Sequence, residues 1–386
     1  MITPEIPPLW GKTGYIGGGE TYPINLALAL AKANHHVTLV TSGGSQGKEA
    51  NFGDNLRIVW AKSITSIPFR HQNPLLLKIR PLLNEDYEIV HVHQLRTISS
   101  VMGCGIAKIR KKPSILTDHG GGSRAFFPSP FLPARFPDAF AAVSHFSSNW
   151  FKYLAPKASN FVIYGGVDTG IFHPQNNLET LRQGLKTEGY HIILYVGRVL
   201  PYKGIDVLIG ALRYLPLNTK LLIVGPCIDK ACLEYLKGLA SNISPNRVHF
   251  LGAVKDEELP LFFNICDVFV MPTVNIDYLG RYHPFPEFFN LSTLEAIACG
   301  KPVVVSNTGG LPESIFNGEN GFVVKQRDEK QLAHAIEILL EDEKLRTKMG
   351  VAGLKWIQKE FTWSMIATKV VRVYETVLRE QFSHQK

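Results

Sequence analysis

Two glutamates, Glu287 and Glu295, stand eight residues apart in the second half of this 386-residue chain. Glu287 follows two prolines and is expected in a loop, whereas Glu295 lies among apolar residues at helical spacing. The predicted helix ends at Gly300, and its first turn near 289–292 would leave backbone N–H groups that favour an anion. The two carboxylates could accept hydrogen bonds from sugar or ribose hydroxyls. Alternatively, one is a solvated helix residue and the other a cap.

Two basic residues lie about 90 residues before this pair. Arg198 follows a predicted buried strand, 191–196, and Lys203 precedes Gly204 at the start of a predicted helix, 205–215. A guanidinium at the end of a buried strand must face solvent or an anion, because burying it alone is costly. Together the two side chains suit a diphosphate by charge and donor geometry. The alternative is a surface Arg and Lys that flank a loop.

The first half holds a glycine turn, with Gly18 and Gly19, before a predicted helix, and histidines at the ends of predicted strands. Glycines let a phosphate or an acceptor approach the backbone closely. His91 and His93 end one predicted strand and His119 follows another, and strand ends of this kind face the ligand in parallel sheets. His119 could be a hydrogen-bond partner near neutral pH or an ordinary loop residue. No third ligand for zinc accompanies the histidines.

The composition indicates a reduced, globular protein of two domains. Apolar residues make up 45% of the chain and charged residues 19%. No apolar run reaches the roughly 18–20 residues of a membrane span, and the first residues have three prolines and no apolar core typical of a secretory signal. The five cysteines are odd in number and scattered, which indicates free thiols. We therefore expect a cytoplasmic protein.

The net charge of +8 is concentrated in the first domain. Lys and Arg outnumber Asp and Glu by 17 to 10 in residues 1–172, but only by 24 to 23 in the rest. Such a surface could bind an anionic substrate or the inner face of an anionic membrane, or simply be solvated. Two segments, 67–80 and 126–136, are both apolar and basic, as in lipid-docking segments or ordinary half-buried surface. No motif indicates nucleic acid.

Apolar runs alternate with helical stretches, which is typical of parallel sheets covered by helices. A polar stretch, 175–188, separates two such series, so we predict domains at 1–174 and 175–358 and a C-terminal helix at 359–386. The predicted strands are 37–41, 56–60, 87–93, 114–117, 139–144, 161–164, 191–196, 220–225, 248–254, 266–272 and 302–306.

These motifs, in this order, resemble those of the family 4 glycosyltransferases, which are retaining enzymes of the GT-B fold. Residues 287–295 resemble the family's E-x7-E signature, and 308–313 read Thr-Gly-Gly-Leu-Pro-Glu as in that family. Residues 17–20 resemble its G-G-x-E loop and 167–174 its V-D-x-x-x-F-x-P segment. The resemblance implies an α/β protein of two Rossmann-like domains whose parallel sheets face a central cleft, with the last helix crossing back to the first domain.

The resemblance also implies roles for individual residues. Arg198 and Lys203 would bind the diphosphate of a UDP, GDP or ADP sugar, Glu287 the sugar hydroxyls and Glu295 the ribose, and His119 would position the sugar. No metal or other cofactor is implied. The acceptor is not implied, but the basic first domain would fit a glycan or a lipid-linked sugar, in the synthesis of cell-surface polysaccharide or glycolipid. Rival interpretations are a sugar-nucleotide epimerase or hydrolase on the same fold, or an inactive homologue. The further donor-binding residues implied are Gly18, Gly19, Leu251, Phe289, Asn290, Leu291 and Ser292.

Three departures from the family's pattern bear on the fold and the site. Asn290 replaces a common glycine, which leaves open whether the geometry near the donor sugar is that of the family, since only glycine lacks a Cβ. The loop 273–286 is long and aromatic, and could determine specificity. The first strand is missing or reduced to Met1–Thr3. Because that strand is normally central, we expect either that the sequence starts several residues too late or that the first domain is weakened.

Overall fold

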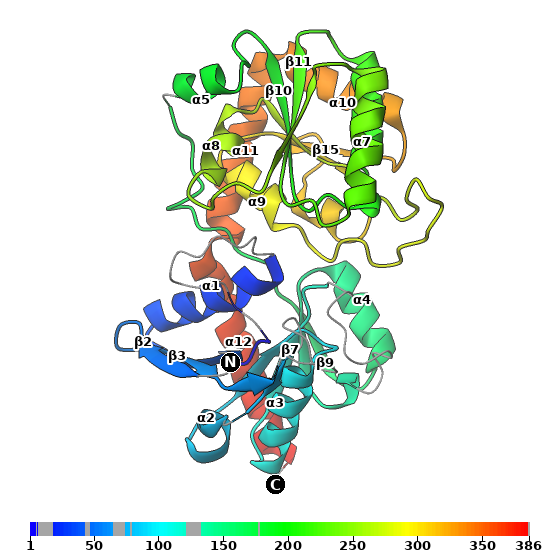
Figure 1. Ribbon diagram of the computed structural model, residues 1–386. Helices are drawn as coiled ribbons and strands as arrows, with labels where there is room; N and C mark the ends of the chain where they lie inside the picture. Colours follow the sequence, from blue (N-terminus) through cyan, green and yellow to red (C-terminus); the bar gives the residue numbers. More distant parts are fainter. Residues whose placement is uncertain are drawn as a thin grey trace. The chain divides into compact units, whose positions relative to one another are not determined.

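The computed structural model divides the chain into two compact units (Figure 1). One comprises Met1–Gly166 together with Trp363–Lys386, and the other comprises Val167–Thr362. The residues that the structure describes are 1–4, 6, 18–42, 47–64, 74–77, 79–120, 133–176 and 178–384. The described part of the chain has no helix that is both long and apolar enough to cross a bilayer.

The first unit is built on parallel strands in the order β3-β1 and β6-β7-β8-β9, with β2 antiparallel at the edge beside β3. Helix α1 packs against α12, and α2 packs against α3. The strands are β1 (Val37–Ser42), β2 (Lys48–Asn51), β3 (Leu56–Ala61), β6 (Val90–His93), β7 (Ser114–Thr117), β8 (Ala139–Ala142) and β9 (Ser159–Val162), with a small hairpin of β4 (Ser63–Ile64) and β5 (Leu75–Leu76). The helices are α1 (Gly18–Lys32), α2 (Arg80–Asn84), α3 (Ile98–Ile109), α4 (His145–Leu154) and α12 (Trp363–His384).

Residues 1–3 join the two groups of strands. The Ile2 N–H donates to the His91 carbonyl and the Ile2 carbonyl accepts from the His93 N–H, each at 2.9 Å. On the other side, the Val40 N–H donates to the Met1 carbonyl at 2.9 Å. The central strand is therefore reduced to these residues, as one of the two sequence-based alternatives had it, and its backbone groups are paired on both sides.

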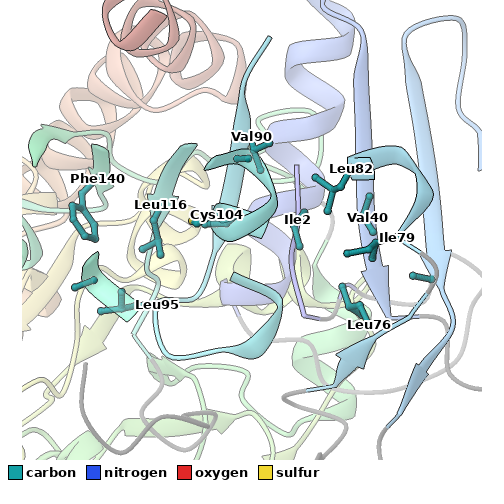
Figure 2. Close-up of a cluster of buried hydrophobic side chains, with 14 of the residues drawn as sticks. Ile2, Val40, Leu76, Ile79, Leu82, Val90, Leu95, Cys104, Leu116 and Phe140 are labelled. Carbon is teal, nitrogen blue, oxygen red and sulfur yellow. The ribbon is translucent and has the colours of Figure 1, made fainter. Parts of the chain in front are cut away.

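Ile2 is also part of the apolar core of this unit (Figure 2). Its side chain is 1% exposed and lies among residues from β1, β6 and α3. Gly103 in α3 makes room for it, because a Cβ there would come within 2.8 Å of the Ile2 Cδ1 atom. A very short strand thus receives the side-chain packing of a central one.

Helix α12 returns to the first unit, which confirms the prediction that the last helix crosses back. The Tyr374 hydroxyl lies 2.7 Å from His91 Nδ1, and the Ser159 hydroxyl donates to Glu380 at 3.0 Å. Near its start the Trp363 ring packs edge-on against Tyr22 of α1, with centroids 5.1 Å apart. The apolar stripe of this helix therefore covers the sheet and α1.

The second unit has a sheet of parallel strands in the order β12-β11-β10-β13-β14-β15. Helices α7 and α10 lie on one side of this sheet, and α8, α9 and α11 on the other (Figure 1). The strand order reverses between β10 and β13, and ligands of such sheets bind at the carboxyl ends of the strands there. The strands are β10 (His191–Val196), β11 (Thr219–Val224), β12 (Val248–Gly252), β13 (Val268–Met271), β14 (Val303–Ser306) and β15 (Gly321–Val324). The helices are α5 (Glu179–Gly184), α6 (Ile205–Ala211), α7 (Lys230–Ile243), α8 (Leu259–Ile265), α9 (Leu291–Ala298), α10 (Glu329–Glu341) and α11 (Glu343–Glu360).

The boundaries of the units differ from the predicted ones at 174/175 and 358/359. Residues 167–174 belong to the second unit because Asn264 holds them: its side chain donates to the His173 carbonyl at 3.0 Å, and the Phe172 ring packs against Phe263. Residues 359–362 also belong there, since the Phe361 ring packs on Trp356. The polar stretch after residue 174 therefore lies inside the second unit.

Candidate active site

The carboxyl end of β10 carries the two predicted diphosphate ligands. The Arg198 carbonyl accepts a hydrogen bond from the Tyr195 hydroxyl at 2.8 Å, and Lys203 ends a short 3-10 turn. Gly204 then adopts a left-handed φ of 69°, and a Cβ there would lie 2.0 Å from the Pro272 carbonyl oxygen. Only glycine allows this approach. The turn that carries Lys203 is thereby pressed against the end of β13.

Lys203 forms an ion pair with Glu287, and both side chains are largely buried, at 7% and 13% exposure. Glu287 is held by its backbone, because the Gly310 N–H donates to its carbonyl at 3.0 Å. Gly309 has a φ of 54°, and a Cβ on it would lie 2.0 Å from the same carbonyl oxygen. The glycine turn after β14 thus fixes the first glutamate of the pair beside the lysine from β10.

Tyr202 lies beside both basic residues, and the sequence analysis did not identify it. Its hydroxyl is 3.5 Å from an Arg198 guanidinium nitrogen, and its ring centroid is 5.5 Å from the Lys203 ammonium. The second distance is that of a cation–π contact. The signal in the sequence was its place next to Lys203.

Helix α9 starts with a hydrogen-bonded cap. The Asn290 side chain accepts from the Thr293 N–H at 2.9 Å, and its backbone φ is −121°. This is an extended backbone conformation open to any residue, so the position of Asn290 does not require a glycine. Within the described residues, the N–H groups of Leu291 and Ser292 have no hydrogen-bond partner. The ring of Phe289, just before the cap, stacks on Phe361.

Glu295 lies on α9 and is half-buried. Burial of its carboxyl raises the pKa to about 8, and the nearby Asp256 adds to this rise. The carboxyl therefore keeps its proton near neutral pH when no ligand is bound. Asp256 follows β12, so the end of that strand, with Leu251, lies on the side of the unit where Glu295 is found.

The aromatic loop 273–286 is organised around a buried carboxylate. Asp277 accepts from Arg281 and from His283, each at 2.9 Å, and its side chain is fully buried. Burial alone would raise the pKa of Asp277, but these hydrogen bonds outweigh it and lower the pKa to about 2. The His283 ring packs on Tyr202 at 4.9 Å. The loop therefore reaches the residue that contacts Arg198 and Lys203.

The first unit presents a histidine cluster at the ends of β6 and β7, defined by His91, His93 and His119. His93 Nδ1 lies 3.1 Å from His119 Nε2, and the rings of His91 and His93 stack at 4.4 Å. Gly19 of α1 lies against the cluster, since a Cβ on it would be 3.4 Å from the His119 Cβ. Gly18 begins that helix, whereas residue 17 lies outside the described residues.

Burial keeps His91 and His93 of this cluster neutral. It lowers the pKa of His91 to about 3, with the N-terminal amine and His119 adding smaller effects. It also lowers the pKa of His93 well below the usual value. In the described part of the chain, no three His, Cys, Asp or Glu side chains are placed to hold a metal ion.

Gln94 is a second residue that the sequence analysis missed. It is buried and has a φ of 75°, which is unusual for a residue with a Cβ. With its amide oriented to satisfy its neighbours, the nitrogen donates to Asp118 at 3.3 Å and to the Gly120 carbonyl at 3.1 Å. A Cβ on Gly19 would lie 2.6 Å from this amide group. Gln94 thus links the start of α1 to the segment that carries His119.

The structure therefore gathers the predicted residues in two places. Arg198, Lys203 and Glu287 come together in the second unit, and Gly19 and His119 in the first. The predicted lipid-docking segments fall largely on residues 65–73, 78 and 121–132, which lie outside the described residues.

Comparison with known proteins assigns both units. Residues 16–170 match the family model "Glycosyltransferase Family 4", and residues 177–356 match "Glycosyl transferases group 1". The D-inositol 3-phosphate glycosyltransferase of Corynebacterium efficiens is 30% identical over 97% of this chain and 94% of its own. An uncharacterized glycosyltransferase of Methanocaldococcus jannaschii, MJ1178, is 28% identical over 76% of each chain.

Solved structures show the same fold. Anabaena HepE in complex with UDP has a TM-score of 0.75 at 20% identity, covering 97% of this chain and 99% of that one. Sucrose-phosphate synthase from Thermosynechococcus elongatus has a TM-score of 0.74 at 21% identity, covering 98% and 99%. With its two parallel-sheet units and returning helix, the chain belongs to the family 4 glycosyltransferases of the GT-B fold.

Proposed function

We propose that this glycosyltransferase moves a hexosyl group from a nucleotide-diphosphate sugar to a glycan or lipid-linked acceptor, with retention of the anomeric configuration. The observation that carries the proposal is the buried Lys203–Glu287 pair beside Arg198, at the point where the strand order of the second sheet reverses. A pair of cations with an adjacent carboxylate suits a diphosphate joined to a hydroxyl-rich sugar.

Arg198 and Lys203 would neutralise the charge that develops on the leaving diphosphate, which is the main electrostatic task of the transfer. Each charge-assisted hydrogen bond would contribute about 1.5–3 kcal/mol. In the ligand-free protein Glu287 neutralises Lys203. When the donor binds, the phosphate would take over this lysine and Glu287 would accept hydrogen bonds from the sugar hydroxyls.

Other donor contacts would come from the second unit. The N–H groups of Leu291 and Ser292, next to Phe289 and the Asn290 cap, would face the phosphate end of the donor. Glu295 would bind the ribose hydroxyls, and the backbone near Leu251 would bind the base.

In the first unit, His119 would position the sugar, and the helix start at Gly18 and Gly19 would leave room for it. His91 and His93 behind it are neutral, so this end of the sheet suits hydroxyl groups rather than phosphate. We propose that the two basic residues of the second unit make a metal ion unnecessary.

The acceptor is proposed to belong to a cell-surface polysaccharide or glycolipid pathway at the cytoplasmic face of the membrane. The excess of basic residues in the first 172 supports this, as it would attract an anionic surface. A relative from Mycobacterium tuberculosis, 30% identical over 67% of this chain, is a GDP-mannose-dependent phosphatidylinositol monomannoside mannosyltransferase. If the proposal holds, the protein should float with anionic vesicles at low salt. Absence of binding would contradict the proposed contact with the membrane.

The donor can be identified by thermal melting with UDP, GDP and ADP, each with and without magnesium. The nucleotide that binds the native state should raise the melting temperature. The same shift with EDTA is expected if no metal is needed, and loss of the shift with EDTA would contradict that expectation.

Transfer is then tested with the matching nucleotide sugar. Lys203→Ala and Glu295→Ala should abolish transfer, whereas Arg213→Ala, which removes an exposed ion pair with Glu329 in the same unit, should leave it unchanged. Normal turnover in both site variants would overturn the assigned roles. Release of free sugar or an epimer without an acceptor would instead indicate a hydrolase or epimerase.

A further inference from the structure

We propose that His93 is a positioning residue that fixes the ring orientation and the tautomer of His119, so that His119 carries its proton on Nδ1. This proposal rests on the proposed role of His119 at the donor sugar, but it concerns a property of the histidine cluster that can be measured without any substrate.

The geometry of His93 leaves it little freedom. It is fully buried, and its ring lies between those of His91 and His119, at centroid distances of 4.4 Å and 5.4 Å. The ring planes of His93 and His119 are 11° apart, and Nδ1 of the first lies 3.1 Å from Nε2 of the second. A hydrogen bond at this distance is directional, so it fixes the orientation of the His119 ring.

The His91 ring, which stacks on His93, is itself held in place by two hydrogen bonds. Its Nδ1 lies 2.7 Å from the Tyr374 hydroxyl, and its Nε2 lies 2.8 Å from the Thr117 hydroxyl. Both ring nitrogens are therefore partnered, and the ring on which His93 stacks is anchored to α12 and to β7. The Tyr22 ring also packs against His119, with ring centroids 4.4 Å apart.

The tautomer follows from the hydrogen-bond partners of His93. Within the described residues, His93 Nε2 is buried and has no hydrogen-bond partner. A neutral imidazole carries one proton, and burial keeps His93 neutral. Placing that proton on Nε2 would bury an unpaired N–H, which native proteins avoid most strongly. The proton therefore lies on Nδ1 and is donated to His119 Nε2.

That donation determines the protonation of His119. Its Nε2 acts as the acceptor, so a neutral His119 holds its own proton on Nδ1. The N–H on Nδ1 is then the one donor of the neutral His119 ring, so His93 decides which ring nitrogen of His119 can donate. If His119 could change tautomer, its Nδ1 would carry the proton in only a fraction of the protein molecules. Only that fraction would have the active site in its competent form.

The test uses the full chain with nitrogen-15 labelled histidine, at pH 8, where an ordinary imidazole is neutral. Two-bond proton–nitrogen couplings report the tautomer of each ring, and His119→Asn identifies the His119 signals by their loss. We expect the Nδ1–H tautomer in the wild type and a mixture in His93→Phe, which keeps an aromatic ring but no hydrogen bond. His93→Asn places an amide near the original Nδ1 and should restore the wild-type form.

The matched control is Val92→Ala. Val92 is the neighbouring residue of β6, is fully buried and points to the opposite face, toward Gly103. It should lower stability without changing the His119 signals. An Nε2–H tautomer of His119 in the wild type would overturn the proposal even if His93→Phe did not fold, and so would unchanged signals in a folded His93→Phe.

Transfer kinetics separate this proposal from the proposed function. We expect His93→Phe to lower kcat by about 10- to 100-fold with a smaller change in KM, and His93→Asn to recover most of it. If His119→Asn leaves transfer unchanged, the role of His119 is wrong while the tautomer result stands. If the tautomer is as proposed but kcat of His93→Phe equals that of Val92→Ala, the tautomer does not serve catalysis.

Discussion

The two sheets end in opposite kinds of chemistry. At the carboxyl end of the second sheet, a buried lysine and glutamate carry full charges and neutralise each other. At the carboxyl end of the first, burial keeps His91 and His93 uncharged. The same strand geometry therefore supports an ionic site in one unit and a neutral site in the other.

This difference indicates which kind of ligand group each end suits. An ion pair can exchange one partner for a phosphate, because the charge is already desolvated and only its counterion changes. A neutral, stacked cluster gains nothing from a phosphate but can form directed hydrogen bonds with hydroxyls. The ionic end of the second sheet therefore suits phosphate, and the neutral end of the first sheet suits hydroxyl groups.

The largest expected effect concerns the ion pair. Lys203→Met or Glu287→Gln alone should destabilise the second unit by about 3–5 kcal/mol, because each leaves a buried charge unpaired. The variant with both substitutions should lose much less stability, because neither charge is left unpaired. Hydrogen exchange followed by mass spectrometry measures each unit separately. If the two single effects add up in the double variant, the pair is not coupled and the comparison fails.

The next effect is acid destabilisation of the first unit. The unfolded state binds a proton on His91 near pH 6.5, but the folded state does so only near pH 3. Stability should therefore fall as pH falls below 6.5, by about 2 kcal/mol between pH 7.5 and 5 from His91 alone. His91→Asn should flatten this slope in hydrogen exchange. Equal acid sensitivity in the variant and the wild type would contradict the assignment.

A smaller effect of opposite sign is expected from Glu295 in the second unit. Its folded pKa of about 8 lies above that of an unfolded glutamate, so its contribution is complete below about pH 4.5 and is lost as pH rises through 8. Because the side chain is half-buried and partly screened, we expect a loss of about 1 kcal/mol between pH 6 and 8.5. Glu295→Gln should not show this loss in thermal melts, and an identical loss would contradict the prediction.

The smallest expected effect concerns Asp256, which lies near Glu295. Asp256→Asn removes the carboxylate that adds to the raised pKa of Glu295. The pH at which stability is lost should move slightly lower, by an amount worth about 0.5 kcal/mol at low salt, and high salt should reduce the difference. A shift in the other direction would show that Asp256 acts on Glu295 by some means other than charge.

The sequence predicted the elements that are buried on both faces. The strands 114–117 and 191–196 begin and end where they were predicted, since a strand of a parallel sheet is a continuous apolar run. Strand β2 was missed because its residues, Lys48–Asn51, are mostly exposed and have no apolar pattern. The last helix was predicted to begin at residue 359, but it begins at Trp363, after a break from α11 at residues 361–362.

The site was predicted in its residue types but not in its pairings. Lys203 and Glu287 are 84 residues apart, and only the fold brings them together. Gln94 and Tyr202 carry no motif, so their contacts could not be inferred from spacing. Met1–Thr3 looked too short to be a strand, and its inclusion depends on backbone hydrogen bonds from both neighbours.

The return of α12 has a consequence for how the protein is made. A ribosome releases residues 1–166 long before Trp363–His384, and yet the two segments form one unit. Until the last helix emerges, the faces of α1 and His91 that it covers remain exposed to water and to other chains. The second unit is contiguous and can fold earlier, although it comes later in the sequence. A nascent chain that stalls before residue 363 would therefore have an incompletely folded first unit. The surface that α12 normally covers would be the part on which chaperones are expected to act.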